Sequence, residues 1–192
     1  EEKKKNKKQF PNLVESVLKT KEPQDNRPVL LMAQDEGRFG RLGQVMKAWC
    51  PKGHRPLVAK QGVREYVYAY AAIAPALGQM TTLVLPYVNI SMMELFLQEV
   101  SNDFEDYFII MQVDQASWRH EVSPLGHISD KLNIPDNIRL IPQTSHSPEL
   151  NPVEHLWEAI RENYFYNEVF ESLEKVIDTL CEGLNFFNSV PE

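Results

Sequence analysis

Two apolar segments that each end in aspartate constrain the fold of this chain more than any other feature. Residues 29–35 and 107–114 have the length and the continuous apolar character of buried strands, and they end in Asp35 and Asp114. Side chains at strand ends in an α/β sheet are held by a rigid backbone and still reach solvent, so ligand sites tend to form there. The two aspartates are therefore candidate site residues.

The string of residues 147–157 supplies a third acid. It reads Ser-Pro-Glu-Leu-Asn-Pro-Val-Glu-His-Leu-Trp, and it predicts a helix that begins at Pro152, because proline suits the first helical position. Glu154 would then lie in the first turn of that helix. Carboxylates from three separate elements together suggest a metal site.

Each of these acids also has a purely structural interpretation. Asp35 precedes a glycine-rich stretch and could satisfy backbone N–H groups of a turn, and Asp114 could cap the element after its strand. Asn151 as N-cap, Pro152 at the next position and Glu154 form an arrangement that resembles a capping box. The residues by themselves leave these alternatives open.

The rest of the pattern predicts further strands and helices. Strands are expected at 44–50, 65–74, 81–85 and 138–141, and helices at 10–22, from a capping box at Ser91–Glu94, from Pro152, and at 172–187. Tyrosines 66, 68 and 70 lie on one face of the second of these strands, and we expect them to pack under helices. On the helix after Pro152, we expect Trp157 in the core and Glu158 paired with Arg161 at the surface.

Length and composition are those of one globular domain. The 192 residues are 43% hydrophobic, which is enough to build a core, and we divide the chain into a basic extension at 1–27 and a compact domain at 28–192. No run of about 18 apolar residues predicts a membrane span, and the charged N-terminus is unlike a signal peptide. We therefore expect no membrane partner and a cytoplasmic protein. Two cysteines far apart in the sequence predict neither a disulfide framework nor a zinc site.

Charge is strongly segregated along the chain. Residues 1–64 hold 15 Lys and Arg against 7 Asp and Glu, whereas residues 65–192 hold 5 against 20. The segment 38–64 contains no acid at all, and it directly follows Asp35. Such a segment suits a polyanion, although a solvated basic hairpin is the alternative. The candidate nucleic-acid-binding residues are Arg38, Arg41, Lys47, Lys52, His54 and Arg55.

Three sequence blocks together resemble a known family. Asp-Glu-x-Arg-Phe-Gly at 35–40, Val-Asp-x-Ala-Ser-Trp at 113–118 and the string at 147–157 are similar to the motifs of DDE transposases, in the bacterial insertion-sequence branch of the Tc/mariner superfamily. The resemblance implies an α/β, ribonuclease H-like fold, with a central mixed β-sheet flanked by α-helices. It also implies that Asp35, Asp114 and Glu154 bind two Mg²⁺ or Mn²⁺ ions.

The resemblance further implies what the protein does. A transposase catalytic domain would cleave DNA strands at transposon ends and transfer them into target DNA, as a homodimer on DNA in the bacterial cytoplasm at the nucleoid. Family members usually carry an N-terminal helix-turn-helix region. No convincing one fits before Pro28, so we expect a catalytic domain alone.

Departures from the family pattern support two alternatives. Gln115 stands where the family usually has Asn, Arg119 stands where it has His, and His146 occupies an aromatic position. One alternative is a catalytically lapsed DNA-binding or assembly module. The other is a ribonuclease H-like nuclease that hydrolyses strands without joining them.

Overall fold

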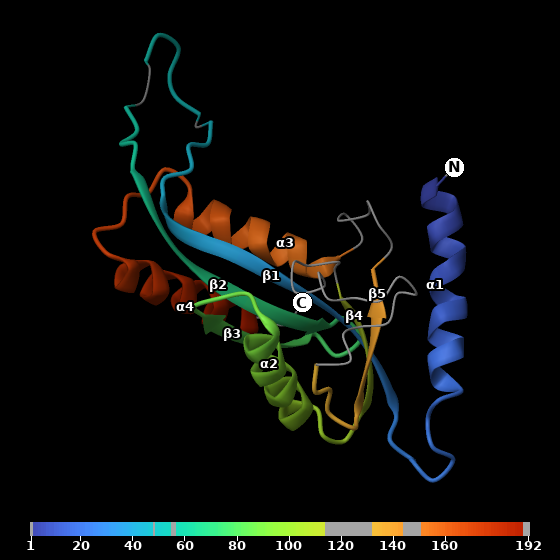
Figure 1. Ribbon diagram of the computed structural model, residues 1–192. Helices are drawn as coiled ribbons and strands as arrows, with labels where there is room; N and C mark the ends of the chain where they lie inside the picture. Colours follow the sequence, from blue (N-terminus) through green and yellow to red (C-terminus); the bar gives the residue numbers. More distant parts are fainter. Residues whose placement is uncertain (1, 48, 55–56, 114–131, 144–150, 190–192) are drawn as a thin grey trace.

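The computed structural model describes residues 2–47, 49–54, 57–113, 132–143 and 151–189, with side chains from Phe10 onward (Figure 1). In chain order its elements are α1 (Glu2–Leu18), β1 (Val29–Leu42), β2 (Gly62–Ala74), β3 (Gln79–Leu85), α2 (Ile90–Asp103), β4 (Phe108–Val113), β5 (Ile138–Pro142), α3 (Pro152–Ile160), the π-helical turn η3 (Arg161–Phe165) and α4 (Leu173–Ser189). Among the described residues, no helix is both long enough and apolar enough to cross a membrane.

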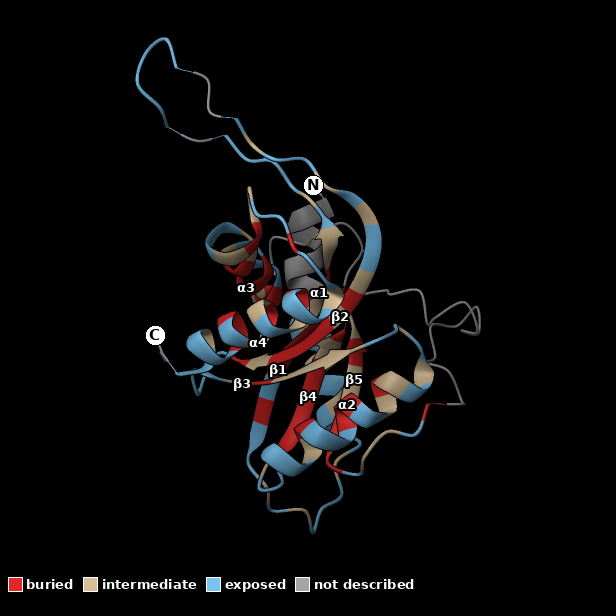
Figure 2. Ribbon diagram, turned by 90° about the vertical axis from the view of Figure 1, so that its left-hand side faces the viewer, coloured by how far each residue is buried: buried red, intermediate tan, exposed pale blue. Residues whose placement is uncertain are grey.

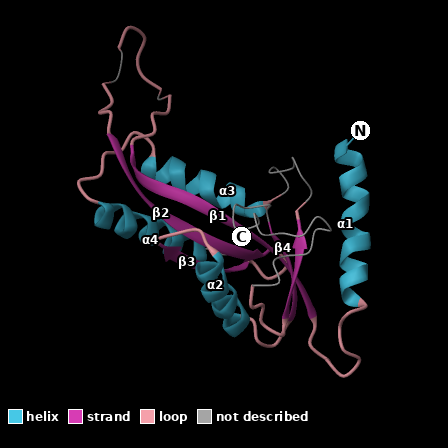
Figure 3. Ribbon diagram, viewed as in Figure 1, coloured by secondary structure: helices cyan, strands magenta, loops and turns pink. Residues whose placement is uncertain are grey.

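The strands form one mixed sheet in the order β3-β2-β1-β4-β5 (Figure 3). β1, β2 and β3 form an antiparallel meander, in which residues 43–61 connect β1 to β2 and a short turn connects β2 to β3, whereas β4 and β5 run parallel to β1. β1 therefore lies at the centre, with an antiparallel neighbour on one side and a parallel neighbour on the other. The expected central mixed sheet is confirmed.

Helices cover both faces of the sheet (Figure 2). Helix α2 is amphipathic, since Met93, Phe96, Leu97 and Val100 are all fully buried against one face. The other face is covered by α3 and α4. Tyr70 packs under α2 as expected, with its ring centroid 5.5 Å from that of Phe96.

The segment 1–27 includes a helix that packs on the sheet. Helix α1 places Phe10, Val14 and Val17 against a small cluster formed by β4 and β5, namely Phe108, Ile110 and Ile141. In this cluster Ile110 pairs with Leu31 of β1, so α1 lies on the same face of the sheet as α3. The helix begins before the expected 10–22 and ends earlier, at Leu18.

Strand β1 does not end at Asp35, contrary to the sequence prediction. It continues to Leu42 and pairs with β2 over most of that length. Gly37 and Gly40, which suggested a turn, lie inside the strand. Neighbouring groups approach the backbone there too closely for a side chain. A Cβ atom on Gly37 would lie 2.8 Å from a ring carbon of Trp157, and one on Gly40 would clash with the Glu65 carbonyl.

The strand expected at 44–50 is also wrong. Among the described residues of 43–61, only Gln44 forms a bridge, to Tyr166, and this described part is an irregular arm that projects from the sheet between β1 and β2 (Figure 1). Residues 51–54 of this arm form a turn, since the His54 N–H donates to the Pro51 carbonyl oxygen at 3.1 Å. Gly53 in this turn has a φ of 93°, which glycine adopts without strain.

Helix α2 begins before the capping box predicted at Ser91–Glu94. Its N-cap is Asn89, whose side-chain oxygen accepts a hydrogen bond from the Met92 N–H at 2.9 Å. Asparagine is as good an N-cap as serine, and here it lies four residues after the end of β3. The predicted strand at 138–141 and the helices from Pro152 and at 172–187 agree with β5, α3 and α4 within two residues.

Candidate active site

Asp35 is a buried carboxylate in the central strand. It pairs across the sheet with Ala71, and two residues on the same face of β1, Ala33 two positions before it and Phe39 four positions after it, pack on the α3 and α4 side. Its side chain is 8% exposed, and Oδ2 accepts a hydrogen bond from the indole Nε1–H of Trp157 at 3.1 Å. A buried carboxylate needs such donors, because its desolvation is otherwise costly.

Asn151 joins three elements at the beginning of α3. Its Oδ1 accepts a hydrogen bond from the Val153 N–H at 3.0 Å, which caps the helix as the sequence predicts. Its Nδ2 donates to the Gln34 carbonyl oxygen of β1 at 3.3 Å and to Gln143 Oε1, just beyond β5, at 3.4 Å. The side chain is 2% exposed. The N-terminus of α3 is thereby fixed beside the residue that precedes Asp35.

Glu154 lies in the first turn of α3 and is exposed to solvent. It precedes Trp157 by three residues, so the two side chains share one side of the helix. Within the described part of the chain, its carboxylate accepts no hydrogen bond and forms no ion pair. Asn151 alone provides the side-chain cap, so the capping-box interpretation of Glu154 lacks its characteristic hydrogen bond.

Asp114 lies outside the described residues. The residue before it, Val113, ends β4 and pairs in parallel with Gln34, the residue before Asp35. Of the residues that the structure describes, no three His, Cys, Asp or Glu side chains are grouped closely enough to hold a metal ion. The three-acid site therefore stays a prediction.

The two described acids suit a hard divalent cation. Asp35 and Glu154 offer carboxylate oxygens, which Mg²⁺ and Mn²⁺ prefer as ligands. The hydrogen bond from Trp157 orients the Asp35 carboxylate, and such supporting bonds are typical around metal ligands. Both acids lie on well-packed elements rather than on loops, which favours a defined geometry.

The basic candidates differ in their surroundings. Arg41 forms an ion pair with Glu65, with Nη1 to Oε2 at 2.8 Å, and its Nε donates to the Phe170 carbonyl oxygen at 3.0 Å. Arg38 lies over the ring of Tyr66, 4.7 Å from its centroid. The arm residues Lys47, Lys52 and His54 are exposed, and Arg55 lies outside the described residues.

Three features of this region do not follow from the sequence. Trp157 was expected in the core, where it lies with 1% exposure, but its hydrogen bond to Asp35 was not foreseen. The links from Asn151 to β1 and to Gln143 were also missed, because only the cap was visible in the sequence. Arg161 does not form the expected ion pair with Glu158; its guanidinium lies over the Phe39 ring, 5.2 Å from the centroid.

Comparison with known proteins identifies the family. The family model for the DDE superfamily endonuclease domain matches residues 30–177. The chain belongs to this family. An uncharacterized protein of Sinorhizobium fredii, y4pE/y4sA, is 33% identical to this chain over 121 residues, which are 62% of this chain and 84% of that protein.

Solved structures of a transposase share the fold. The Mos1 strand transfer complex aligns with a TM-score of 0.57 at 13% identity, and it covers 94% of this chain and 52% of the Mos1 chain. The Mos1 mariner paired-end complex with Mn aligns with a TM-score of 0.54 at 13% identity, over 96% of this chain and 59% of that one. This chain thus has a ribonuclease H-like fold, and it spans little more than half the length of these transposase chains.

Removal of the Asn151 side chain tests its role at the junction. Asn151→Ala loses the helix cap and leaves the Gln34 carbonyl without this donor, so we expect the free energy of unfolding to fall by about 1–3 kcal/mol. Urea denaturation followed by circular dichroism measures the change. Asn163→Ala is a matched control, because within the described structure that side chain bonds only to the Ala159 carbonyl oxygen, four residues earlier in the chain. Equal effects of the two substitutions would contradict the role given to Asn151.

Proposed function

We propose that this chain is the catalytic domain of a DDE transposase, in which Asp35, Asp114 and Glu154 bind Mg²⁺ or Mn²⁺ and act on DNA. The observation that supports this most strongly is the hydrogen bond from Trp157 to Asp35. It joins the central strand to the helix of Glu154, so the first and third acids belong to one packed unit. Family membership and the acid-free basic segment agree with this function.

The proposed chemistry is phosphoryl transfer on DNA. Two divalent ions held by the three carboxylates would supply a nucleophile at neutral pH and stabilise the attacking and leaving oxygens. Asp35 and Glu154 contribute negative oxygen ligands from fixed positions, and Trp157 holds the Asp35 carboxylate in orientation. Cleavage at a transposon end and transfer of that end into target DNA would use the same site.

Metal use and the division of the chain are further parts of this proposal. Mos1 mariner paired-end complexes have been solved with Mg and with Mn, and we extend divalent-metal use, with two ions, to this chain. We assign the catalytic domain to residues 28–192 and an extension to residues 1–27. Within this extension, α1 packs on β4 and β5. We place the protein in the bacterial cytoplasm, at the nucleoid.

The alternatives are a catalytically lapsed DNA-binding or assembly module and a nuclease that only hydrolyses. Retention of all three acids favours an active enzyme, whereas Gln115 and Arg119 are the residues that favour a lapsed one. The alternatives differ in measurable ways. A lapsed module would bind DNA without nicking it, and a hydrolytic nuclease would nick DNA without joining a 3′-hydroxyl end to a plasmid.

Replacement of the Glu154 charge tests the catalytic role. Glu154→Gln removes a metal ligand but keeps an exposed side chain of the same size, so the melting temperature should hardly change. Nicking of supercoiled plasmid DNA in Mg²⁺ or Mn²⁺ should fall by at least about a hundredfold, as expected when a metal-site group is lost. Glu158→Gln, one turn further along the helix, is the matched control and should nick normally. Normal nicking by a folded Glu154→Gln protein would remove Glu154 from the site.

Neutralisation of the arm tests its role in DNA binding. Lys47 and Lys52 are exposed, and we expect Lys47→Ala together with Lys52→Ala to weaken binding of a fluorescent 30-base-pair duplex. The slope of log K against log salt should become shallower by about 0.9 for each lost phosphate contact. Lys175→Ala, an exposed substitution on α4, should leave the slope unchanged. If the arm variant keeps the wild-type slope, the arm does not bind phosphate.

We propose that the protein acts as a homodimer on DNA. The arm exposes Trp49 and Leu57 completely, which is unusual for large apolar side chains and suits a protein contact. Trp49→Ser should therefore shift sedimentation of the DNA complex toward a single protein copy. A wild-type complex that sediments with one copy would refute the dimer, and an unchanged Trp49→Ser complex would exclude the arm as its contact.

A further inference from the structure

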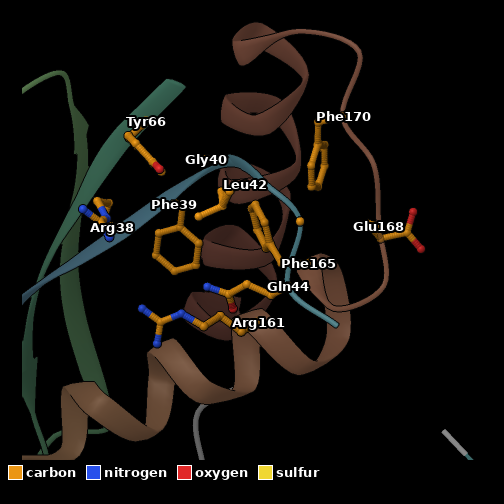
Figure 4. A pocket seen from close by; sticks show the side chains of 11 residues that line it. Arg38, Phe39, Gly40, Leu42, Gln44, Tyr66, Arg161, Phe165, Glu168 and Phe170 are labelled. Atoms are coloured by element: carbon orange, nitrogen blue, oxygen red, sulfur yellow. The ribbon is translucent and has the colours of Figure 1, made fainter. Parts of the chain in front are cut away.

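The arm is held at its base by a loop that is distant in sequence. Residues 166–170 connect η3 to α4, and Figure 4 shows this loop, with Glu168 and Phe170, beside the beginning of the arm at Gln44. Apart from the bridge at Gln44, the described part of the arm has no helix or strand of its own. The bonds at its base therefore set the direction in which it projects.

The outgoing end of the arm bonds to Tyr166 and Asn167. Gln44 forms its bridge with Tyr166, and the Asn167 N–H donates to the Gln44 carbonyl oxygen at 2.9 Å. The Asn167 side chain adds a second bond, because its Oδ1 accepts from the Met46 N–H at 3.0 Å. Asn167 has a φ of 64°, a left-handed conformation that asparagine tolerates better than most residues. A residue held in this way indicates that the surrounding contacts require it.

The returning end of the arm bonds to the same loop. The Gln61 side chain pairs with the backbone of Phe170, since its Nε2 donates to the carbonyl oxygen at 2.7 Å and its Oε1 accepts from the N–H at 3.0 Å. The Gly43 N–H donates to the Gln61 carbonyl oxygen at 3.1 Å and so joins the two ends of the arm. Rotation of the arm about the strand ends would break several of these bonds.

The loop is continuous with the helix that carries Glu154. Helix α3 runs into η3, and the Tyr166 N–H closes this π-helical turn by donating to the Arg161 carbonyl oxygen at 2.8 Å. Phe165 and Phe170 at the two sides of the loop are both buried, with ring centroids 5.1 Å apart. The loop is therefore well packed, and the arm and α3 share one support.

We propose that residues 166–170 are a positioning element that holds the arm at a fixed angle to α3, with Asn167 and Gln61 as its positioning residues. The arm thereby presents Lys47 and Lys52 to the DNA in register with the catalytic acids. A binding element that is already oriented loses less conformational freedom on association than one that swings, so it binds more tightly with the same contacts. The DNA part of this inference rests on the proposed function.

The two cysteines of the chain report the direction of the arm. Cys50 is exposed on the arm, and Cys181 is half-buried on α4. Double electron–electron resonance between spin labels on both, in protein diluted with unlabelled copies, should give one narrow distance distribution. Asn167→Gly combined with Gln61→Ala should broaden it, because glycine keeps the left-handed backbone while the side-chain bonds are lost. A broad distribution in the wild type, or an unchanged one in the double variant, would overturn the positioning element.

The same double variant tests the link to DNA. Its binding of a fluorescent duplex in Mg²⁺-free buffer should weaken roughly threefold to tenfold, because only a fraction of the arms then point toward the DNA. The slope of log K against log salt should stay at the wild-type value, since no phosphate contact is removed. This unchanged slope distinguishes positioning from the direct contacts of Lys47 and Lys52. Wild-type affinity in the double variant would show that the direction of the arm does not serve DNA binding.

Gln98→Ala is the matched control. It removes an exposed glutamine on α2 whose side chain, within the described structure, bonds only to Asn102. This variant should keep both the narrow distance distribution and the wild-type affinity. If the double variant is unstable, Asn167→Gly alone serves the same comparison. Absence of DNA binding by the wild type would contradict the proposed function, whereas the cysteine distances would still decide whether the loop holds the arm.

Discussion

The buried side chain of Asn151 is the junction on which the arrangement of this site depends. One amide group caps α3 and also bonds the backbone of β1 and the side chain of Gln143, so it fixes where the helix meets the sheet. Because it is almost completely buried, no water can replace these bonds cheaply. The direction of α3, and with it the positions of Glu154, Trp157 and Arg161, follows from this single contact.

The second constraint is the packing of Trp157 over the central strand. Its indole ring fits against β1 because residue 37 has no side chain, and its N–H reaches the Asp35 carboxylate. A buried carboxylate would otherwise be costly, and sites of this kind usually persist where function requires them. The same packing thus provides stability and orients a candidate metal ligand. Helix and strand act as one rigid support.

The sequence predicts the strands and helices well where periodicity is strong. The apolar runs of β1 and β4 and the amphipathic pattern of α2 were sufficient, because burial of one face or of both faces leaves a clear pattern. It placed Asp35 at a strand end because Gly37 and Gly40 resemble turn residues. In the structure, these two positions have no room for a Cβ atom, because Trp157 lies against Gly37 and the Glu65 carbonyl lies against Gly40. Both neighbours are distant in sequence.

The contacts that join distant elements could not be read from the sequence. Asn151 was recognisable as a cap, since this needs only its neighbours, but its bonds to β1 depend on the packing of the whole sheet. Arg161 was assigned to the nearest acid by helical spacing, whereas the π-turn and the Phe39 ring give it a different partner. The third acid, Asp114, follows the last described residue of β4, so its part in the site rests on the motif alone.

The central claim is that Asp35 and Glu154 share a divalent metal site, and anomalous scattering from a crystal soaked in Mn²⁺ tests it most directly. The account predicts a peak within about 2.0–2.5 Å of an Asp35 carboxylate oxygen, with Glu154 bound to the same ion or to one about 3.5–4 Å away. It needs no knowledge of the DNA substrate. A fully loaded crystal with Mn²⁺ peaks elsewhere, and with the two carboxylates turned apart, would contradict it.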